Sequence, residues 1–439
     1  MNSFRNRPLS GWLPGPVTRR DLLVGGASAL ALGGLGGRVA RASEVSGQDL
    51  KFLFVFTSGG WDPTRVLAPE FDLSVSGVVD LEPEAGLATA GGISYVQHPD
   101  RPAVDAFFSG HHDRSVVFNG VMTQAIAHEL CTLIAMTGES SGLASDWPSI
   151  LGSAQAARYT LPHLVLGGPS FPGELGVVVA RTGQSGQLDG LLDGSILDGS
   201  DLPVNSSDIR TEGLMDRYLL RRAEARSDAA LSTGERSLVE AFEEALDQAL
   251  DLKDLRHDID LTAANLAGQL EVAVSALSIG MSRCVTMAFP DAYSSSSFDT
   301  HADNDEIQGP LWEQLFQGLG QLMSMLGDAP GQVGTSLADE TVVVVLSEMG
   351  RTPLLNGLAG KDHWPYGSVL LVGPGLDGSR TIGGHDESFF GIPVDLATGE
   401  LDDAGEVITN ASVGATLLQL AGVDPAEYTD AEPVTGVLT

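Results

Sequence analysis

Cysteine is scarce in this chain of 439 residues, which contains only Cys131 and Cys284. Two cysteines allow at most one disulfide, so a framework of several disulfides is excluded. Both lie in apolar surroundings, in the segments HELCTLIAM and MSRCVTMAF, where buried free thiols are common. The sequence therefore leaves one disulfide and two free thiols as alternatives.

Basic side chains are also few, because 24 Lys and Arg stand against 58 Asp and Glu, for a formal net charge of -34. Without its first 42 residues the chain has 18 basic and 57 acidic side chains, a net charge of -39. Such a surface repels nucleic acid and anionic lipid at moderate salt, so we expect neither as a partner. A solvated acidic surface that favours solubility accounts for this charge. An anionic substrate would approach it readily only where a bound cation reverses the local field.

Long hydrophobic runs are lacking, and the nearest candidate lies at the N-terminus. Residues 18–23 (TRRDLL) precede the glycine-rich stretch VGGASALALGGLGG, which is shorter than the ~20 apolar residues that a membrane span needs. Residues 40–42 (ARA) place small residues at both specificity positions of a signal peptidase site. We therefore expect residues 1–42 to be a bacterial signal peptide that is recognised by the twin-arginine translocase and cleaved after Ala42. The mature protein would be periplasmic or secreted, with no stable membrane span.

Apolar strand-like segments alternate with amphipathic segments in the remaining residues, 43–439. The predicted strands cover residues 51–57, 115–118, 161–166, 285–289, 341–347 and 367–373, and the predicted helices residues 101–109, 128–137, 311–326 and 411–421. This alternation predicts one α/β domain, with a mainly parallel central sheet and helices on both faces. The acidic, Gly/Asp-rich residues 183–207 are expected to form a surface loop, and residues 208–281 a helical insertion.

Polar side chains follow three of the predicted strands or the loop after the third, and all are of kinds that bind cations. They are Asp62, Asp299, His301, Glu348, Asp362 and His363. Because the carboxyl ends of parallel strands meet at one edge of a sheet, we expect these side chains to converge there. Carboxylates and imidazoles are ligands of zinc, manganese and related cations, and six such donors would suffice for two cations.

Each of these residues also has a structural explanation. An Asp that follows Gly-Gly, as Asp62 does, is commonly a turn residue or a helix cap. Glu348 is three residues from Arg351, and Asp362 is next to Lys361, so both carboxylates could belong to a structural ion-pair network. The pattern of residues alone leaves the metal site and the ion-pair network as open alternatives.

Seven motifs carry a family resemblance. In order they are TRRDLL (18–23), SGGWD (58–62), HELCTLIAMTG (128–138), FDTHAD (298–303), VVVVLSEMGRTP (342–353), KDHWPYGS (361–368) and ATLLQLAGVDP (415–425). In these motifs the chain resembles the bacterial family known as domain of unknown function 1501, a group of twin-arginine-exported proteins in the alkaline phosphatase/sulfatase-like superfamily. The resemblance implies an alkaline phosphatase-like fold that hydrolyses or transfers phosphate or sulfate esters.

The resemblance also implies roles for particular residues. The six donors above would be the metal ligands, and the cofactor a divalent cation such as zinc, manganese, magnesium or calcium. Arg351 would contact an anionic ester substrate or hold the carboxylates in place. His385 is a further candidate ligand, outside the main motifs.

Two departures from the superfamily pattern bear on catalysis. Relatives carry Ser-His where this chain has Ala127-His128, so the expected hydroxyl nucleophile is missing. Glu348-Met349 also lacks the histidine of the superfamily's Asp-His pair. The resemblance therefore implies attack by water that the cation activates, with His128 as general acid or base, rather than covalent catalysis. We expect an exported, metal-dependent hydrolase of phosphate or sulfate esters; the alternative is a non-catalytic cell-envelope protein that retains the fold, with at most a structural metal.

Overall fold

The computed structural model describes residues 45–73, 79–182, 206–227, 265–290 and 296–439, together with single positions between residues 232 and 246. The predicted signal peptide lies outside the described residues. So do most of the predicted loop at 183–207 and most of the segment 228–264 of the predicted helical insertion.

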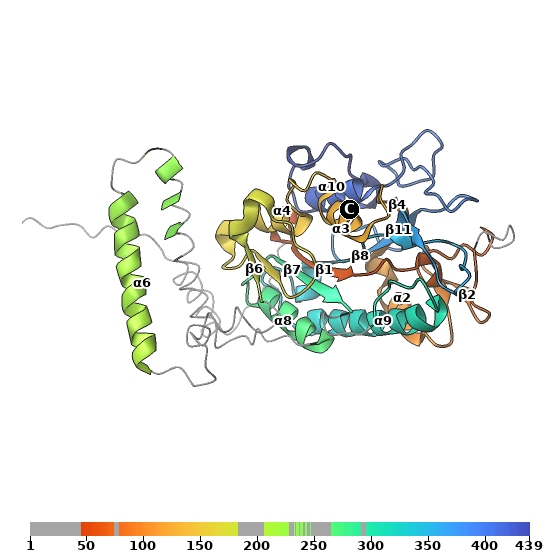
Figure 1. The fold of residues 1–439 in the computed structure, drawn as a ribbon, viewed down its shortest axis with the longest axis horizontal. Helices are drawn as coiled ribbons and strands as arrows, with labels where there is room; N and C mark the ends of the chain where they lie inside the picture. Colours follow the sequence, from red (N-terminus) through yellow and green to blue (C-terminus); the bar gives the residue numbers. More distant parts are fainter. Residues whose placement is uncertain are drawn as a thin grey trace, which may run out of the picture. The chain divides into compact units, whose positions relative to one another are not determined.

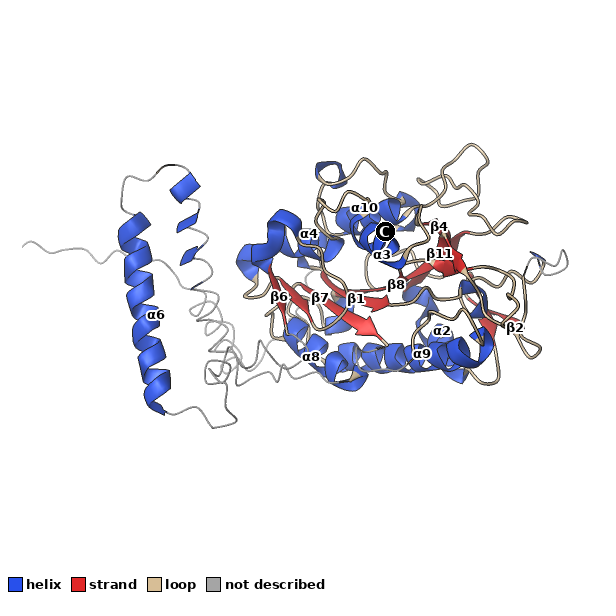
Figure 2. Cartoon of the chain, in the orientation of Figure 1, coloured by secondary structure: helices blue, strands red, loops and turns tan. Residues whose placement is uncertain are grey.

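Eight strands form one sheet in the order β12-β4-β11-β8-β1-β7-β5-β6 (Figures 1 and 2). The strands are β1 (Lys51–Thr57), β4 (Ser115–Met122), β5 (His163–Val165), β6 (Val179–Arg181), β7 (Cys284–Phe289), β8 (Thr341–Ser347), β11 (Tyr366–Val372) and β12 (Arg380–Gly383). β11 is antiparallel to its neighbours β4 and β8, and the other pairs are parallel. The predicted mainly parallel sheet is confirmed. Two small antiparallel pairs accompany it, β2 (Gly86–Ala90) with β3 (Ile93–Gln97) and β9 (Gly350–Arg351) with β10 (His363–Trp364).

Helices cover both faces of the sheet, as predicted (Figure 1). One face carries α2 (Pro102–His111), α8 (Leu266–Ser278) and α9 (Asn304–Asp328), and the other α3 (His128–Thr137), α4 (Trp147–Ser153) and α10 (Asn410–Leu420). The central strand β1 is apolar along its length because it faces both layers: Leu53 and Val55 enter the core with α9, while Phe52, Phe54 and Phe56 enter the core with α10. α6 (Ser206–Ser227) belongs to the segment predicted as a helical insertion.

α9 is longer than the sequence pattern predicts, because it begins at Asn304 and includes Pro310. A proline inside a helix removes one backbone hydrogen bond, which is why the predicted helix begins after it. The helix continues through Pro310 because its neighbours are anchored: Gln308 and Leu311 are buried on either side. None of the helices in the described part of the chain has the length and apolar composition needed to cross a bilayer.

The sheet brings several chain segments to one edge. β1, β7 and β8 are parallel, so the residues that follow them emerge together, and β4 leads into α3 at the same edge. β11 runs the opposite way, and its amino end therefore also lies there, directly after β10. This arrangement places the residues after three strands, the start of α3 and β10 around one site.

Candidate metal centre

Three histidines and one aspartate meet at this edge of the sheet. His128 is the first residue of α3, Asp299 and His301 follow β7, and His363 begins β10. The Oδ1 atom of Asp299 lies 3.3 Å from Nε2 of His301, 3.5 Å from Nε2 of His128 and 3.9 Å from Nε2 of His363. The Nε2 atoms of His301 and His363 are 3.0 Å apart. The structure thus brings together three of the six predicted ligands and the histidine that was predicted as the general acid or base.

The Nδ1 atom of each imidazole already has an acceptor. Nδ1 of His363 lies 2.6 Å from the backbone oxygen of Ile126, which can only accept, so this nitrogen carries a proton. Nδ1 of His128 lies 2.9 Å from Oε1 of Glu348, and Nδ1 of His301 lies 2.9 Å from Oδ1 of Asp362. In a neutral imidazole that donates through Nδ1, Nε2 is an unprotonated lone pair.

The resulting lone pairs need a positive charge between them. Two Nε2 lone pairs of His301 and His363 that face each other at 3.0 Å repel unless a proton or a cation lies between them. Nε2 of His128 is buried and has no hydrogen-bond partner among the described residues. Ligands of a tetrahedral cation at ~2.1 Å are roughly 3.4 Å from one another. The four separations given above run from 3.0 to 3.9 Å, and the ligand atoms of His128, Asp299 and His363 all lie within 4.8 Å of one another. Nδ1 atoms held by carboxylates or a carbonyl are the usual outer shell of metal-bound histidines. The residues present therefore fit a divalent cation.

Burial and neighbouring charges set the protonation of these groups. Burial lowers the pKa of His363, which favours the neutral imidazole that a cation requires. Burial alone would raise the pKa of Asp299, but the hydrogen bond and charge of Arg351 lower it, so the carboxylate is ionised at neutral pH. The hydrogen bond that Nδ1 of His128 donates to Glu348 raises the pKa of His128. A proton therefore competes with a cation more strongly at His128 than at His363.

Glu348 lies behind His128 rather than beside Asp299. Its Oε1 accepts from the backbone N–H of Gly59 at 2.7 Å as well as from His128, and its Oε2 accepts from the hydroxyl of Ser347 at 2.9 Å. Gly59 has a φ of 109°, and a Cβ on it would meet the backbone nitrogen of Asp299 at 2.4 Å, so glycine is required here. Glu348 therefore orients the imidazole of His128, and Asp362 orients that of His301 in the same way.

Arg351 is fully buried and holds the site together. Its Nη2 donates to Oδ1 of Asp299 at 2.7 Å and to the backbone oxygen of Gly59, and its Nε donates to the backbone oxygen of Gly60 at 2.9 Å. Its Nη1 donates to the backbone oxygen of Lys361 at 3.1 Å. Two roles were expected for Arg351, contact with the substrate or support of the carboxylates. This geometry favours support, because Arg351 already donates four hydrogen bonds to acceptors inside the protein.

The structure does not bring Asp62 into the cluster. Its Oδ2 accepts from Nζ of Lys361 at 2.7 Å and from Nε of Arg65 at 3.1 Å, and its Oδ1 accepts from the hydroxyl of Thr64 at 2.6 Å. Asp62 also caps the short 3-10 helix that begins at Pro63. The cap is the structural alternative that the sequence left open for Asp62. The residue is in addition part of a buried ion-pair network, and both of its oxygens are occupied.

His385, the further candidate ligand, lies elsewhere. Its Nδ1 is 2.9 Å from Oε1 of Glu70, and its ring stacks on Phe389 with centroids 4.0 Å apart. Both cysteines are free and buried, Cys131 in α3 and Cys284 in β7. The alternative of two free thiols is the one that the structure shows.

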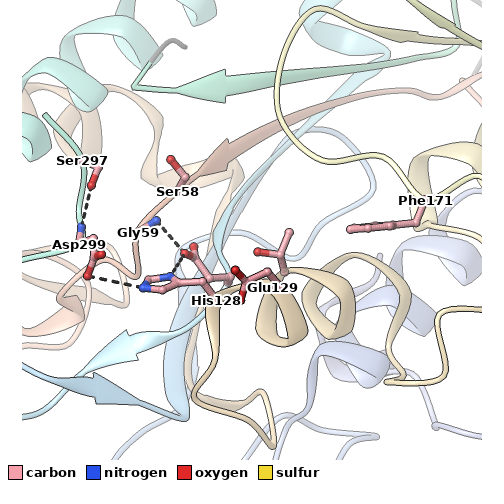
Figure 3. A pocket seen from close by; sticks show the side chains of 9 residues that line it. Ser58, Gly59, His128, Glu129, Phe171, Ser297 and Asp299 are labelled. Carbon is pink, nitrogen blue, oxygen red and sulfur yellow. Dashed lines mark hydrogen bonds and ion pairs between the residues drawn. The ribbon is translucent and has the colours of Figure 1, made fainter. Parts of the chain in front are cut away.

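A pocket of about 530 Å³ opens beside His128, Asp299 and Glu348 (Figure 3). Its other described lining residues are Ser58, Gly59, Glu129, Thr132, Phe171 and Ser297. None of these six was predicted from the sequence. The position of Thr132, four residues after His128 on a predicted helix, was a usable signal, because residues four apart share a helix face.

Asp362→Asn is expected to weaken metal binding about 10-fold, since the loss of an outer-shell partner of a metal-bound histidine costs 10- to 100-fold and asparagine can still accept a hydrogen bond. The side chain of Asp362 is 61% exposed, so the fold should be unaffected. Competition with a chromophoric chelator measures the affinity. Asp100→Asn, at an 87% exposed carboxylate, is the matched control and should leave the affinity unchanged. Equal affinities of the wild type and Asp362→Asn would contradict an orienting role.

Residues 51–432 match the model of a protein family described as "Protein of unknown function (DUF1501)". The chain belongs to this family. None of the curated proteins matches the chain.

The chain is similar to several solved structures at low identity. The lipoteichoic acid synthase LtaP from Listeria monocytogenes shares 9% identity and a TM-score of 0.40, over 92% of this chain and 80% of that chain. A protein in the alkaline phosphatase superfamily from Vibrio parahaemolyticus shares 9% identity and a TM-score of 0.36, over 88% and 68%. The PsFucS1 sulfatase from Pseudoalteromonas sp. shares 11% identity and a TM-score of 0.37, over 90% and 73%. All three TM-scores lie below 0.5, so the functional proposal rests on this chain's own side chains.

Proposed function

We propose that this protein is an exported hydrolase of phosphate or sulfate esters that depends on a divalent cation held by His128, Asp299, His301 and His363. The observation that carries the proposal is the convergence of three Nε2 atoms on one carboxylate, with every Nδ1 held by an acceptor. Export rests on the twin-arginine pattern of residues 1–42.

The chain's own residues would prepare the reaction in several ways. When bound, a divalent cation supplies Lewis acidity to an ester oxygen and makes water a stronger nucleophile at neutral pH. Glu348, Asp362 and the carbonyl of Ile126 fix the three imidazoles, so the ligands need no reorganisation. Arg351 holds Asp299 in its ionised form. His128 presents Nε2 to the cluster, and we therefore propose it as a ligand rather than as the predicted general acid or base.

Water is favoured over a covalent nucleophile by the start of α3. Ala127 precedes His128 as the N-cap and has no hydroxyl. The nearby Thr123 is buried, and its hydroxyl accepts from Nδ2 of Asn410 at 3.0 Å. The missing hydroxyl at Ala127 is also the observation that favours the second candidate, a non-catalytic cell-envelope protein that keeps the fold and a structural metal.

The proposal is tested by metal analysis and turnover on the mature protein. Elemental analysis is expected to find a divalent cation in stoichiometric amount, and an aryl phosphate, an aryl phosphodiester or an aryl sulfate is expected to be hydrolysed. Removing the cation with a chelator should abolish this turnover, and adding it back should restore it, because the cation supplies the Lewis acidity. Bound metal without turnover of any of the three esters would favour the second candidate, and a folded protein without metal would exclude both metal-dependent functions.

A further inference from the structure

The described residues that line the pocket beside the metal centre include neither lysine nor arginine. Of these nine residues three are carboxylates, Glu129, Asp299 and Glu348. Arg351 lies behind the pocket with four of its donor contacts used on backbone oxygens and Asp299. An ester anion would therefore find its counter-charge at the cation alone, and the rest of its surroundings would be acidic.

Glu129 differs from the other two carboxylates. Asp299 accepts from Arg351, and Glu348 accepts from His128, Gly59 and Ser347. The carboxylate of Glu129, by contrast, is exposed and has neither a hydrogen bond nor an ion pair with the described residues. Its place in the first turn of α3 suits the helix dipole, which accounts for an acid there but gives it no partner. A negative charge that lines a pocket without a partner favours a cationic group of the ligand.

Phe171 adds an aromatic ring to the pocket. It comes from the segment between β5 and β6, and Figure 3 shows its ring directed toward Glu129 at the start of α3. An ammonium or quaternary ammonium group is attracted to the face of an aromatic ring as well as to a carboxylate. The pocket volume of about 530 Å³ has room for such a group beside an ester.

We propose that Glu129 and Phe171 bind the cationic end of a zwitterionic substrate, so that the ester hydrolysed at the cluster is one of an amino or quaternary ammonium alcohol. This inference rests on the proposed function, because it needs the ester at the cation. It also bears on how the substrate approaches. The protein carries a formal net charge of -34, which repels a simple ester anion more strongly than an ester whose own positive group offsets part of its negative charge.

Binding of two matched phosphonates tests the proposal. The probes are the phosphonate analogue of phosphocholine and its isostere with a tert-butyl group in place of the trimethylammonium group. Both resist hydrolysis, both keep the phosphonate charge, and they differ only in the positive charge. Calorimetry on the cation-loaded protein is expected to show about 5- to 10-fold tighter binding of the charged probe, the sum of one exposed ion pair and one cation–π contact. Glu129→Gln should reduce this ratio to about 2-fold, and Phe171→Leu should reduce it separately. Glu84→Gln, at an exposed carboxylate that does not line the pocket, should retain the wild-type ratio.

Inorganic phosphate, as a third probe, separates the two proposals. Cation-dependent binding of phosphate with equal affinity for the two phosphonates would overturn the zwitterion proposal and leave the hydrolase proposal standing. A charge preference that survives both Glu129→Gln and Phe171→Leu would also overturn it. Absence of phosphate binding to the cation-loaded protein, together with absence of turnover of the aryl sulfate, would overturn both.

Discussion

Replacing Asp299 by Asn and His363 by Ala in one variant is expected to leave the protein folded but without bound metal. Together the two residues supply two of the four converging ligand atoms. Loss of an outer-shell partner alone typically weakens metal binding by 10- to 100-fold, so loss of two ligands should exceed about 100-fold and abolish turnover. Asparagine at position 299 can still accept from Nη2 of Arg351, which keeps the buried guanidinium partnered.

Elemental analysis and circular dichroism on the purified variant measure the two parts of this expectation. His98→Asn is the matched control, since His98 lies between β3 and α2, where its nearest carboxylate is Asp100. That control should retain metal, activity and fold. A double variant that keeps stoichiometric metal would show that the cluster of His128, Asp299, His301 and His363 is not the site.

Asp62→Asn is expected to lower the free energy of unfolding by about 3–5 kcal/mol, the usual cost of removing one partner from a buried ion pair. The substitution leaves Lys361 fully buried without its carboxylate, which lies 2.7 Å from Nζ. Arg65 is affected less, because it also contacts Glu82 and Asp305. Urea denaturation of the wild type and the variant at neutral pH measures the difference, and Asp100→Asn should fall within about 0.5 kcal/mol of the wild type.

The ion pair of Asp62 and Lys361 also predicts how the free energy of unfolding depends on pH. Burial would raise the pKa of Asp62, but the charges of Lys361 and Arg65 outweigh it and lower the pKa below its ordinary value of 3.8. A lowered pKa in the folded state means that the stabilisation is present above the unfolded pKa and is lost as the pH falls through the folded pKa. The difference between the wild type and Asp62→Asn should therefore be constant from about pH 7 to about pH 5 and shrink below about pH 4. A difference that grows on acidification would contradict this account of the network.

The sequence predicts which segments meet at the site better than it predicts what each side chain does there. The buried strands β1, β7 and β8 follow from their apolar β-branched runs, and parallel pairing brings the residues after them to one edge. Asp299, His301 and His363 were found in this way. Strand periodicity ends with the strand, however, and it carries no information on where a side chain in the next loop points.

Asp62 and Glu348 show where prediction from the sequence fails. Asp62 lies in the loop after β1, separated from the two glycines by Trp61. Lys361 and Arg65 nevertheless hold it inside the protein, and the position of Lys361 depends on contacts distant in sequence. Glu348 lies at the correct edge but behind His128, because the backbone N–H of Gly59 and the hydroxyl of Ser347 hold its carboxylate there. Every residue has a backbone carbonyl, so the sequence cannot indicate which one accepts a given hydrogen bond. The hydrogen bond from His363 to the carbonyl of Ile126 can therefore be identified only in the structure.

The cluster is assembled from residues as far apart in sequence as His128 and His363, with Asp299 and His301 between them. An unfolded chain cannot offer these ligands together, so a cation that they hold binds only the native state. Folding and loading are then thermodynamically linked, and a free cation at 100 times its dissociation constant would add about 2.7 kcal/mol to the free energy of unfolding. The melting temperature of the protein would consequently rise with cation concentration, and a chelator would lower it.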